Sequence, residues 1–381
     1  MTAVAVLGST GSIGRQALEV IAALGDLDVR GLAAGRASEA FAQQAARWPD
    51  ARAWTTGDRP DWLAAPRWAD GGLEELATLP DVDLVVVATT GMAALPAVLA
   101  ALRSGRRVAL ANKETLVTGG HLVTAVLDEL DGDPLDRLRP IDSEHSAIWQ
   151  CLVGERIADV TRLILTASGG PFRGRAASEL GAVTPEEALA HPTWRMGPKI
   201  TIDSATLVNK AFEVIEARWL YRLPYRKIDA VIHPQSVVHS LVEFADGSVK
   251  AQLGLPDMRL PIQYALTFPS RRPSPARSAR PETWGALEFS ALEPAAYPAY
   301  DACRSAAEAG GNRGTILNAA DEVAVAAFLA GRLPLPGIAD TIADAVDRWG
   351  ADDEPSLDQI AGLDAEVRAE LGSRLRPEGR A

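Results

Sequence analysis

Apolar and polar positions alternate in blocks along the first 130 residues. Short apolar runs predict buried strands of a parallel sheet, and the stretches between them carry apolar residues at helical spacing. The runs that predict strands are 3–7, 29–33, 82–88 and 107–111. The stretches that predict helices are 16–24, 40–47, 94–103 and 121–130, the last after a break at Gly119-Gly120. This alternation indicates an α/β fold that begins with a Rossmann-like domain.

The pattern changes beyond residue 140. Strands are predicted at 160–166 and 228–232, and residues 237–244 and 248–255 predict an antiparallel hairpin. Long helices are predicted at 205–221, 300–309, 315–330, 338–348 and 357–371. Residues 269–281 are rich in Pro, Arg and Ser without a period, which is typical of a linker. The stretch 49–80 receives no assignment.

Composition and charge narrow the class of protein. The 381 residues are 47% hydrophobic and 23% charged, with a net charge of −12. We therefore expect no general attraction to nucleic acid or to an acidic membrane. Neither a signal peptide nor a bilayer-spanning run is visible, and Cys151 and Cys303 form no C-x-x-C pair. These features predict a soluble cytoplasmic protein.

The loop from Gly8 to Gly14 joins the first strand to the first helix. Glycines permit a tight turn and let backbone N–H groups approach a pyrophosphate, so the loop predicts a dinucleotide site. The spacing is G-x-x-G-x-x-G rather than G-x-G-x-x-G, and a plain strand-to-helix turn also fits it. The cofactor contacts predicted in this loop are Thr10, Gly11, Ser12 and Ile13.

The end of the second predicted strand indicates which dinucleotide binds. A protein that binds NAD usually places an acidic residue there, but this chain has Gly35-Arg36-Ala37. A guanidinium group suits a 2′-phosphate, which favours NADP over NAD. The alternative is that Arg36 is an ordinary solvated loop charge.

Asn112, Lys113 and Glu114 follow the strand at 107–111. Polar residues just after a parallel strand lie where such folds bind ligands, so we expect all three at the site. A surface lysine at a helix start is the alternative for Lys113.

Asp142 and Glu144 are two residues apart in the stretch 141–145. If that stretch is extended, both carboxylates point the same way and repel each other by about 4 kcal/mol at roughly 4 Å and an effective dielectric constant of ~20. A cation removes this cost, so the pair predicts half of a Mg²⁺ or Mn²⁺ site. A solvated strand end without a ligand is the alternative.

A group of polar residues in the middle of the chain suits a phosphate. Ser168 opens a possible anion-binding turn with two glycines, and charge-assisted hydrogen bonds contribute about 1.5–3 kcal/mol each. Residues 191–198 lack a regular period and predict a mobile lid, although Trp194 also fits core packing. The residues predicted to hold the phosphate are Ser168, Ser204, Asn209 and Lys210.

Eight motifs occur in one order and together resemble the 1-deoxy-D-xylulose 5-phosphate reductoisomerase family over nearly the whole chain. That family makes 2-C-methyl-D-erythritol 4-phosphate in the non-mevalonate isoprenoid pathway, with NADPH and a divalent metal ion. The motifs are Gly8-Ser-Thr-Gly-Ser-Ile-Gly14, Ala111-Asn-Lys-Glu114, Ile141-Asp-Ser-Glu-His145, Thr166-Ala-Ser-Gly-Gly-Pro-Phe172, His191-Pro-Thr-Trp-Arg-Met-Gly197, Asp203-Ser-Ala-Thr-Leu-Val-Asn-Lys210, Glu213 and His233-Pro-Gln-Ser236.

The resemblance implies roles for individual residues. Glu213 would join Asp142 and Glu144 as a third ligand of Mn²⁺, Mg²⁺ or Co²⁺. Lys113, Ser143 and Glu144 would contact the reacting oxygens of a small phosphorylated sugar. His191 and Trp194 would close over the substrate, with Met196 and Gly197 beside the nicotinamide. Lys113, Glu144 and His191 are the catalytic residues that the resemblance implies.

The resemblance also sets the expected domains. They are an NADPH-binding domain (1–141), a catalytic domain (142–267) with a lid at about 168–198, a linker (268–293) and a helical C-terminal domain (294–381). The family expectation is a homodimer. The hairpin predicted at 237–244 and 248–255 is interpreted as sheet structure that supports the site and forms the dimer interface. His233 and His239 are interpreted as structural.

Two other functions stay open. An aspartate-semialdehyde-type NADP dehydrogenase needs a nucleophilic cysteine, and Cys151 follows an apolar segment that indicates packing. A non-catalytic NADP-binding regulator needs no carboxylate cluster. The chain also departs from the family in having Asp321 where Asn is usual, and Arg36 where lysine is common.

Overall fold

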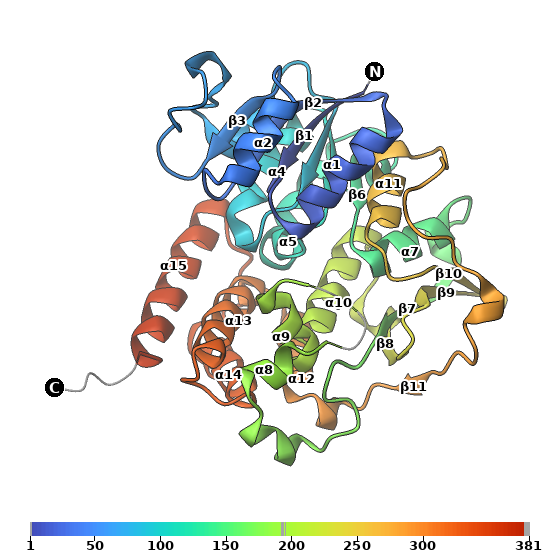
Figure 1. Ribbon diagram of the computed structural model, residues 1–381. Helices are drawn as coiled ribbons and strands as arrows, with labels where there is room; N and C mark the ends of the chain where they lie inside the picture. The colour runs from blue at the N-terminus through green and yellow to red at the C-terminus, as the bar shows by residue number, and fades with distance from the viewer. Residues whose placement is uncertain (1, 192–193, 195, 377–381) are drawn as a thin grey trace. The chain divides into compact units, whose positions relative to one another are not determined.

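The computed structural model describes residues 2–191, 194 and 196–376 (Figure 1). Its chain forms two compact units, and each unit gathers segments that are far apart in the sequence. Unit 1 comprises Met1–Thr115, Leu122–Gln150 and Asp257–Ser278. Unit 2 comprises Leu116–His121, Cys151–Pro256 and Ala279–Ala381. The predicted domain limits at residues 141 and 267 stay predictions.

Unit 1 is built on a parallel sheet in the order β3-β2-β1-β4-β5-β6. All of its strand pairs are parallel. The strand order reverses between β1 and β4, which is the point where sheets of this kind bind ligands. The strands are β1 (Thr2–Leu7), β2 (Leu27–Ala34), β3 (Arg52–Thr55), β4 (Leu84–Val87), β5 (Arg107–Leu110) and β6 (Leu138–Pro140).

The helices of unit 1 bury their apolar sides on this sheet. The core includes Val4 and Val86 of the sheet, Ile21 of α1, and Ile262 of α11. Trp149 lies edge-on to Tyr264 of α11, with ring centroids 4.7 Å apart. The helices are α1 (Ser12–Leu24), α2 (Glu39–Arg47), α3 (Gly72–Ala77), α4 (Leu95–Arg103), α6 (Pro134–Arg137) and α11 (Arg259–Thr267), together with parts of α5 (Glu114–Asp128) and α7 (Ser143–Leu152).

The stretch 49–80, which the sequence left unassigned, forms the β3 edge of this sheet. It contains β3, the 3₁₀ turn Ala65–Arg67 and α3. Arg67 fixes it to the end of α2, because its guanidinium donates to the carbonyl oxygens of Ala45, Trp48 and Ala51 at 2.9 Å each. Hydrogen bonds from a side chain to the backbone do not appear as a pattern of apolar residues, so the sequence did not predict this packing.

Unit 2 contains a mixed sheet in the order β10-β9-β7-β8-β11. Strand β7 runs parallel to β8 and antiparallel to β9, and β9 and β10 form the predicted antiparallel hairpin. The two-residue strand β11 was not predicted. The strands are β7 (Val160–Ala167), β8 (Ile228–Ile232), β9 (Val238–Phe244), β10 (Val249–Leu253) and β11 (Ser290–Ala291).

Helices supply most of the core of unit 2. That core joins Ala167 of β7, Phe212 of α10, and Leu317 and Phe328 of α13. The four predicted C-terminal helices are confirmed as α12–α15, orange to red in Figure 1. The helices are α8 (Pro185–Leu189), α9 (Pro198–Thr206), α10 (Val208–Tyr221), α12 (Pro298–Ala309), α13 (Arg313–Leu329), α14 (Gly337–Trp349) and α15 (Leu357–Arg374).

Two predicted helix limits are wrong. The helix predicted at 205–221 is interrupted by Leu207, whose φ of 58° ends α9 and starts α10. The break predicted at Gly119-Gly120 is only a kink, because α5 continues through Gly119 (φ −130°, ψ 24°). Gly120 is needed for packing, since a Cβ atom there would overlap the Trp219 ring.

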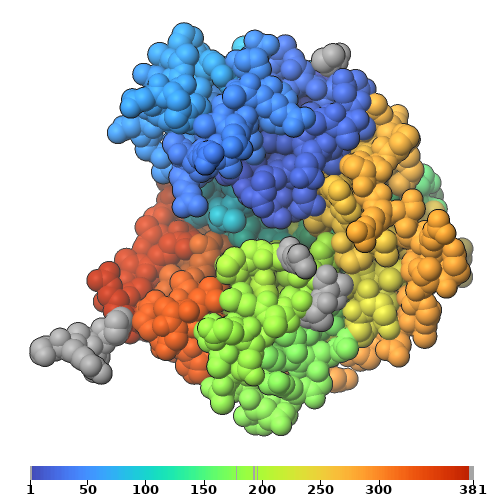
Figure 2. Space-filling model, viewed as in Figure 1, coloured from blue at the N-terminus to red at the C-terminus, as the bar shows by residue number. Residues whose placement is uncertain are grey.

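The segment 269–281 is irregular and largely exposed, as its composition indicates, and its orange atoms lie on the surface in Figure 2. Among the helices that the structure describes, none is both long and apolar enough to cross a membrane.

Candidate active site

The glycine loop after β1 is held in a tight turn. The N–H groups of Gly8 and Ser9 both donate to the Ala33 carbonyl oxygen of β2, at 2.9 and 2.7 Å. Gly8 has a φ of +89°, and a Cβ atom on Gly14 would overlap the Gly8 carbonyl oxygen. The N-cap of α1 is Gly11, which has no side chain to cap the first-turn N–H groups. These groups are therefore available for an anion.

Gln44 joins the glycine loop to α2 by hydrogen bonds, and the sequence did not predict this role. The Ser9 hydroxyl donates to Gln44 Oε1 at 2.7 Å, and Gln44 Nε2 donates to the Ser9 carbonyl oxygen at 2.9 Å. Ser9 is fully buried. Arg36 lies exposed between β2 and α2, where Ser38 caps the helix. A single glutamine on a helix carries no signal in the sequence for this role.

Asn112 organises the polar turn after β5. Its amide nitrogen donates to the carbonyl oxygens of Thr89 and Gly91 and to Glu114 Oε2, at 2.9–3.0 Å. Its oxygen accepts the Thr115 N–H at 2.9 Å. The buried Asn112 thereby connects the loop after β4 with the start of α5. This arrangement places Lys113 and Glu114 directly after β5, at the carboxyl end of the parallel sheet.

Asp142 and Glu144 do not lie on an extended strand, so that expectation is wrong. Helix α7 begins at Ser143, and the Asp142 carbonyl oxygen accepts the Ser146 N–H at 2.8 Å. The helical turn still brings carboxylate oxygens of Asp142 and Glu144 within 4.8 Å of each other. The two acids are therefore close, but through a strand-to-helix turn rather than through strand alternation.

Within unit 1, Lys113 contacts Asp142, one member of the carboxylate pair Asp142 and Glu144. Its ammonium lies 2.9 Å from Asp142 Oδ2, and His145 Nδ1 lies 3.7 Å from the same oxygen. The Ser143 hydroxyl donates to Glu144 Oε2 at 2.5 Å. Lys113 is only 7% exposed, so it is not the surface lysine of the alternative interpretation.

In unit 2, the His191 ring bridges the loop after β7 and the segment that follows α8. The Trp194 N–H donates to His191 Nδ1 at 2.9 Å, so the neutral ring carries its proton on Nε2 and donates it to Ser168 Oγ at 3.2 Å. Burial lowers the pKa of His191, which favours this neutral form. Residues 192, 193 and 195 of the predicted lid lie outside the described residues.

The loop 168–170 lies against Ser204. Gly170 has a φ of +68°, and a Cβ atom on it would lie 2.6 Å from the Ser204 carbonyl oxygen. The Ser168 hydroxyl accepts the Gly170 N–H at 3.2 Å, which closes the turn. Two serines predicted to bind phosphate are thus on adjoining segments.

The first turns of α10 bring the other predicted phosphate ligands to Glu213. Asn209 Nδ2 donates to Glu213 Oε1 at 2.5 Å, and Lys210 Nζ forms an ion pair with Glu213 Oε2. The i+3 and i+4 spacing predicted these contacts. The side chains of Lys210 and Glu213 are 4% and 2% exposed, so this helix face is not an ordinary solvated surface.

The two cysteines do not suit nucleophilic catalysis. Burial raises the pKa of the Cys151 thiol to about 11, and it raises that of Cys303 well above the ordinary value. A nucleophilic cysteine needs a thiolate at neutral pH. The dehydrogenase alternative is therefore not supported by either residue.

His233 has a structural role, as predicted. Its Nε2 accepts the N–H groups of Val237 and Val238 at 3.2 and 3.1 Å, while Nδ1 lies 2.8 Å from the Glu288 carbonyl oxygen. Both ring nitrogens are thus used by the backbone.

The predicted site residues fall on both units. Unit 1 holds Thr10, Gly11, Ser12, Ile13, Gly35, Arg36, Ala37, Asn112, Lys113, Glu114, Asp142, Ser143 and Glu144. Unit 2 holds Ser168, His191, Trp194, Met196, Gly197, Ser204, Asn209, Lys210 and Glu213. Within each unit the structure brings the polar residues into the local groups described above. The metal ligand set of Asp142, Glu144 and Glu213 stays a prediction.

Models of known protein families match most of the chain. The 1-deoxy-D-xylulose 5-phosphate reductoisomerase model matches residues 4–120, and the C-terminal domain model of the same enzyme matches residues 138–221. The DXP reductoisomerase C-terminal domain model matches residues 253–370.

Individual relatives agree over nearly the full length. The chain is 46% identical to the 1-deoxy-D-xylulose 5-phosphate reductoisomerase of Pelotomaculum thermopropionicum, with 97% of each chain covered. It is also 46% identical to that of Geobacillus kaustophilus, with 98% of this chain and 100% of the relative covered.

Solved structures show the same fold. A DOX-P reductoisomerase in complex with NADPH, fosmidomycin and magnesium has a TM-score of 0.90 and 35% identity over 98% of each chain. The Zymomonas mobilis enzyme in complex with NADPH has a TM-score of 0.86 and 36% identity, over 98% of this chain and 99% of that one.

Proposed function

The chain belongs to the 1-deoxy-D-xylulose 5-phosphate reductoisomerase family, and we propose that it performs that family's reaction through the residues described above. It rearranges and reduces 1-deoxy-D-xylulose 5-phosphate to 2-C-methyl-D-erythritol 4-phosphate with NADPH and a divalent metal ion. The observation that carries this proposal is the group formed by the buried Lys113 with the half-buried Asp142 and Glu144, at the carboxyl edge of the parallel sheet of a dinucleotide fold.

The donors present suit a hard divalent cation. Carboxylate oxygens of Asp142 and Glu144 lie within 4.8 Å of each other, and oxygen ligands are those that Mg²⁺ and Mn²⁺ prefer. We assign Glu213 as the third ligand. The bound ion supplies Lewis-acid stabilisation of negative charge on substrate oxygens.

The residues around this pair orient the substrate. Lys113 places its ammonium 2.9 Å from Asp142, so it can donate to a reacting oxygen beside that carboxylate. The Ser143 hydroxyl is oriented by its bond to Glu144 and can do the same. We assign contacts with the reacting oxygens to Lys113, Ser143 and Glu144.

A second group of residues holds the phosphate end of the substrate. Lys210 supplies the positive charge and Asn209 supplies amide donors, both from the first turns of α10. Ser168 and Ser204 add hydroxyl groups from adjoining segments. This local arrangement compensates for a chain whose net charge is −12. The neutral His191 and Trp194 then cover the substrate.

NADPH, which supplies the hydride, binds at the glycine loop. The free N–H groups at the start of α1 receive the pyrophosphate, and Arg36 receives the 2′-phosphate. We assign Asn112, Glu114, Met196 and Gly197 to the nicotinamide end.

The test follows NADPH absorbance with purified protein and 1-deoxy-D-xylulose 5-phosphate, first with Mn²⁺ and then with a chelator. Oxidation that requires both substrate and metal ion supports the proposal. Folded protein that binds NADPH but does not oxidise it under either condition contradicts the proposal and favours a regulator.

A homodimer in the cytoplasm completes the proposal. Strand β10 is an edge strand on which Val249 and Leu253 are 51% and 36% exposed. An exposed apolar edge strand is suited to pairing with another chain. Light scattering that gives the mass of one chain at micromolar concentration would contradict the dimer.

A further inference from the structure

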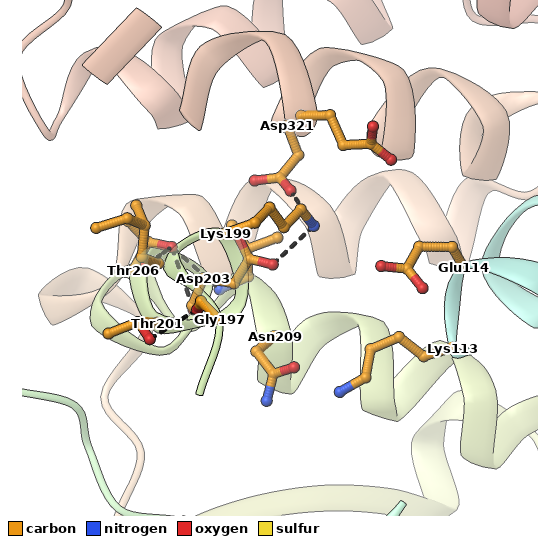
Figure 3. Close-up of polar contacts among 12 residues, drawn as sticks. Lys113, Glu114, Gly197, Lys199, Thr201, Asp203, Thr206, Asn209 and Asp321 are labelled. Carbon is orange, nitrogen blue, oxygen red and sulfur yellow. Dashed lines mark hydrogen bonds and ion pairs between the residues drawn. The ribbon is translucent and has the colours of Figure 1, made fainter. Parts of the chain in front are cut away.

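A buried ionic cluster lies at the first turn of α9, beside the predicted phosphate and nicotinamide contacts. The Lys199 ammonium lies 2.7 Å from Asp203 on the same helix and 2.6 Å from Asp321 on α13 (Figure 3). The side chains of Asp203 and Asp321 are 4% and 0% exposed, and that of Lys199 is 30% exposed. One cation therefore bridges two buried carboxylates on two helices.

The same ammonium also contacts a third helix. Lys199 Nζ lies 5.2 Å from the centroid of the Phe212 ring on α10, and Phe212 is fully buried. A cation over an aromatic face at this distance is attracted to the ring. Helices α9, α10 and α13 are thus joined at one side chain.

Helix α9 has a particular need for such a contact. It begins directly after Gly197, whose carbonyl oxygen accepts the N–H and the hydroxyl of Thr201 at 3.1 and 2.9 Å (Figure 3). It contains Ser204 next to Asp203, and it ends at the left-handed Leu207. The break at Leu207 prevents α10 from fixing α9 by continuous helix. Side-chain contacts must fix it instead.

Stability alone is a poor explanation for the cluster. Replacing a buried cluster of ions by packed apolar residues of similar volume is often neutral or stabilising, because ions lose their hydration on burial. A cluster that is costly to bury but joins three helices is suited to fixing geometry.

We propose that Lys199 is a positioning residue: its contacts with Asp203 and Asp321 fix the position of α9. Gly197 and Ser204 are thereby held at the distance from each other that the substrate requires. This inference rests on the proposed function, because it assigns Gly197 to the nicotinamide end and Ser204 to the phosphate. Lys199 acts through α9 and does not itself contact the reacting atoms.

The test compares Lys199→Met with a matched control, Arg368→Met. Arg368 is also a cation shared by two carboxylates, since it contacts Asp364 at 2.6 Å and Glu322 at 2.8 Å. Its side chain is 29% exposed, close to the 30% of Lys199, but it joins α15 to α13 and lies on neither α9 nor α10. The control therefore reports the general effect of removing such a cation.

We expect Lys199→Met to raise KM for 1-deoxy-D-xylulose 5-phosphate and to lower kcat, by roughly tenfold or more in kcat/KM, because small misplacements of binding groups are costly. We expect KM for NADPH to change much less, since the pyrophosphate and 2′-phosphate contacts lie in unit 1. Arg368→Met should leave these constants near those of the wild type. Equal kinetic effects in both variants would overturn the inference.

Hydrogen exchange supplies a readout that does not depend on turnover. Amides 200–206 of α9 should exchange faster in Lys199→Met than in Arg368→Met, and unchanged exchange would overturn the inference. If the wild-type protein shows no turnover, the proposed function fails while this comparison still tests the cluster. If Lys199→Met does not fold, Asp321→Ala replaces it, because that variant keeps the Lys199–Asp203 pair and removes the contacts that Asp321 on α13 makes with both residues.

Discussion

At the scale of single residues, chemistry could be predicted better than geometry. The sequence identified Asp142 and Glu144 as a close pair, and they are close, although a helical turn rather than a strand brings them together. Lys113 was predicted from its place after a parallel strand, and its burial excludes the surface alternative. Gln44 and Lys199 could not be predicted, because their partners are remote in sequence or depend on helix packing.

Glu213 provides the sharpest test of the metal ligand assignment. In Glu213→Gln a ligand charge is lost while the amide keeps a similar shape. Because loss of residues that merely support metal ligands costs about 10–100-fold, we expect turnover at saturating NADPH to fall by at least roughly a hundredfold. NADPH binding, measured by fluorescence titration, should persist.

The control for this substitution is Glu308→Gln, which removes the charge of a half-exposed glutamate paired with Arg304 on α12. It should have little effect on turnover. If Glu213→Gln weakens NADPH binding as strongly as it reduces turnover, Glu213 has been assigned to the wrong group.

Arg36 carries the prediction of coenzyme choice. The Arg36→Ala variant should bind NADPH more weakly by roughly ten- to hundredfold, because charge-assisted hydrogen bonds of about 1.5–3 kcal/mol are lost. NADH has no 2′-phosphate, so its affinity should change little. Titration of both coenzymes measures the ratio, and an unchanged ratio would remove Arg36 from the 2′-phosphate site.

At the scale of elements, hydrophobic period predicted the strands and helices that have a clear apolar face. The hairpin β9–β10 and the helices α12 and α14 follow that period, whereas α13 is buried on nearly all sides. The stretch 49–80 does not follow that period. Part of this stretch is held instead by hydrogen bonds from the Arg67 guanidinium to backbone carbonyl oxygens. The break at Leu207 also escaped prediction, because a leucine with positive φ carries no local signal.

The cluster of Lys199, Asp203 and Asp321 makes the free energy of unfolding depend on pH. Burial raises the pKa of Asp321 above its ordinary value of 3.8, and the Lys199 ammonium offsets part of this rise. The stability that a group with a raised folded-state pKa contributes is complete below the ordinary value and is lost as pH rises through the folded-state pKa. Asp321→Asn cannot titrate. Its free energy of unfolding, relative to wild type, should therefore increase from pH 4 upward, as measured by urea unfolding.

Asp246→Asn is the control for the sign of this effect. Hydrogen bonds from Ser248 lower the pKa of the exposed Asp246, so its contribution is present above the ordinary value and lost as pH falls. The stability of Asp246→Asn relative to wild type should therefore decrease as pH rises. A difference for Asp321→Asn that is flat or decreases with pH would contradict the prediction.

At the scale of the whole molecule, the family resemblance extends over both units. Family models match residues 4–120, 138–221 and 253–370, and related enzymes are 46% identical over nearly the full length. The order of the motifs, rather than any one of them, made this predictable. Which segments belong to each unit could not be predicted in full, because unit 1 also contains residues 257–278, which come late in the chain.

The central claim is that this chain both rearranges and reduces its substrate. The most direct measurement is the ¹³C NMR spectrum of the product formed from ¹³C-labelled 1-deoxy-D-xylulose 5-phosphate with NADPH and Mn²⁺. We predict the branched carbon skeleton of 2-C-methyl-D-erythritol 4-phosphate, in an amount equal to the NADPH oxidised. A reduced product with an unbranched skeleton would contradict the account.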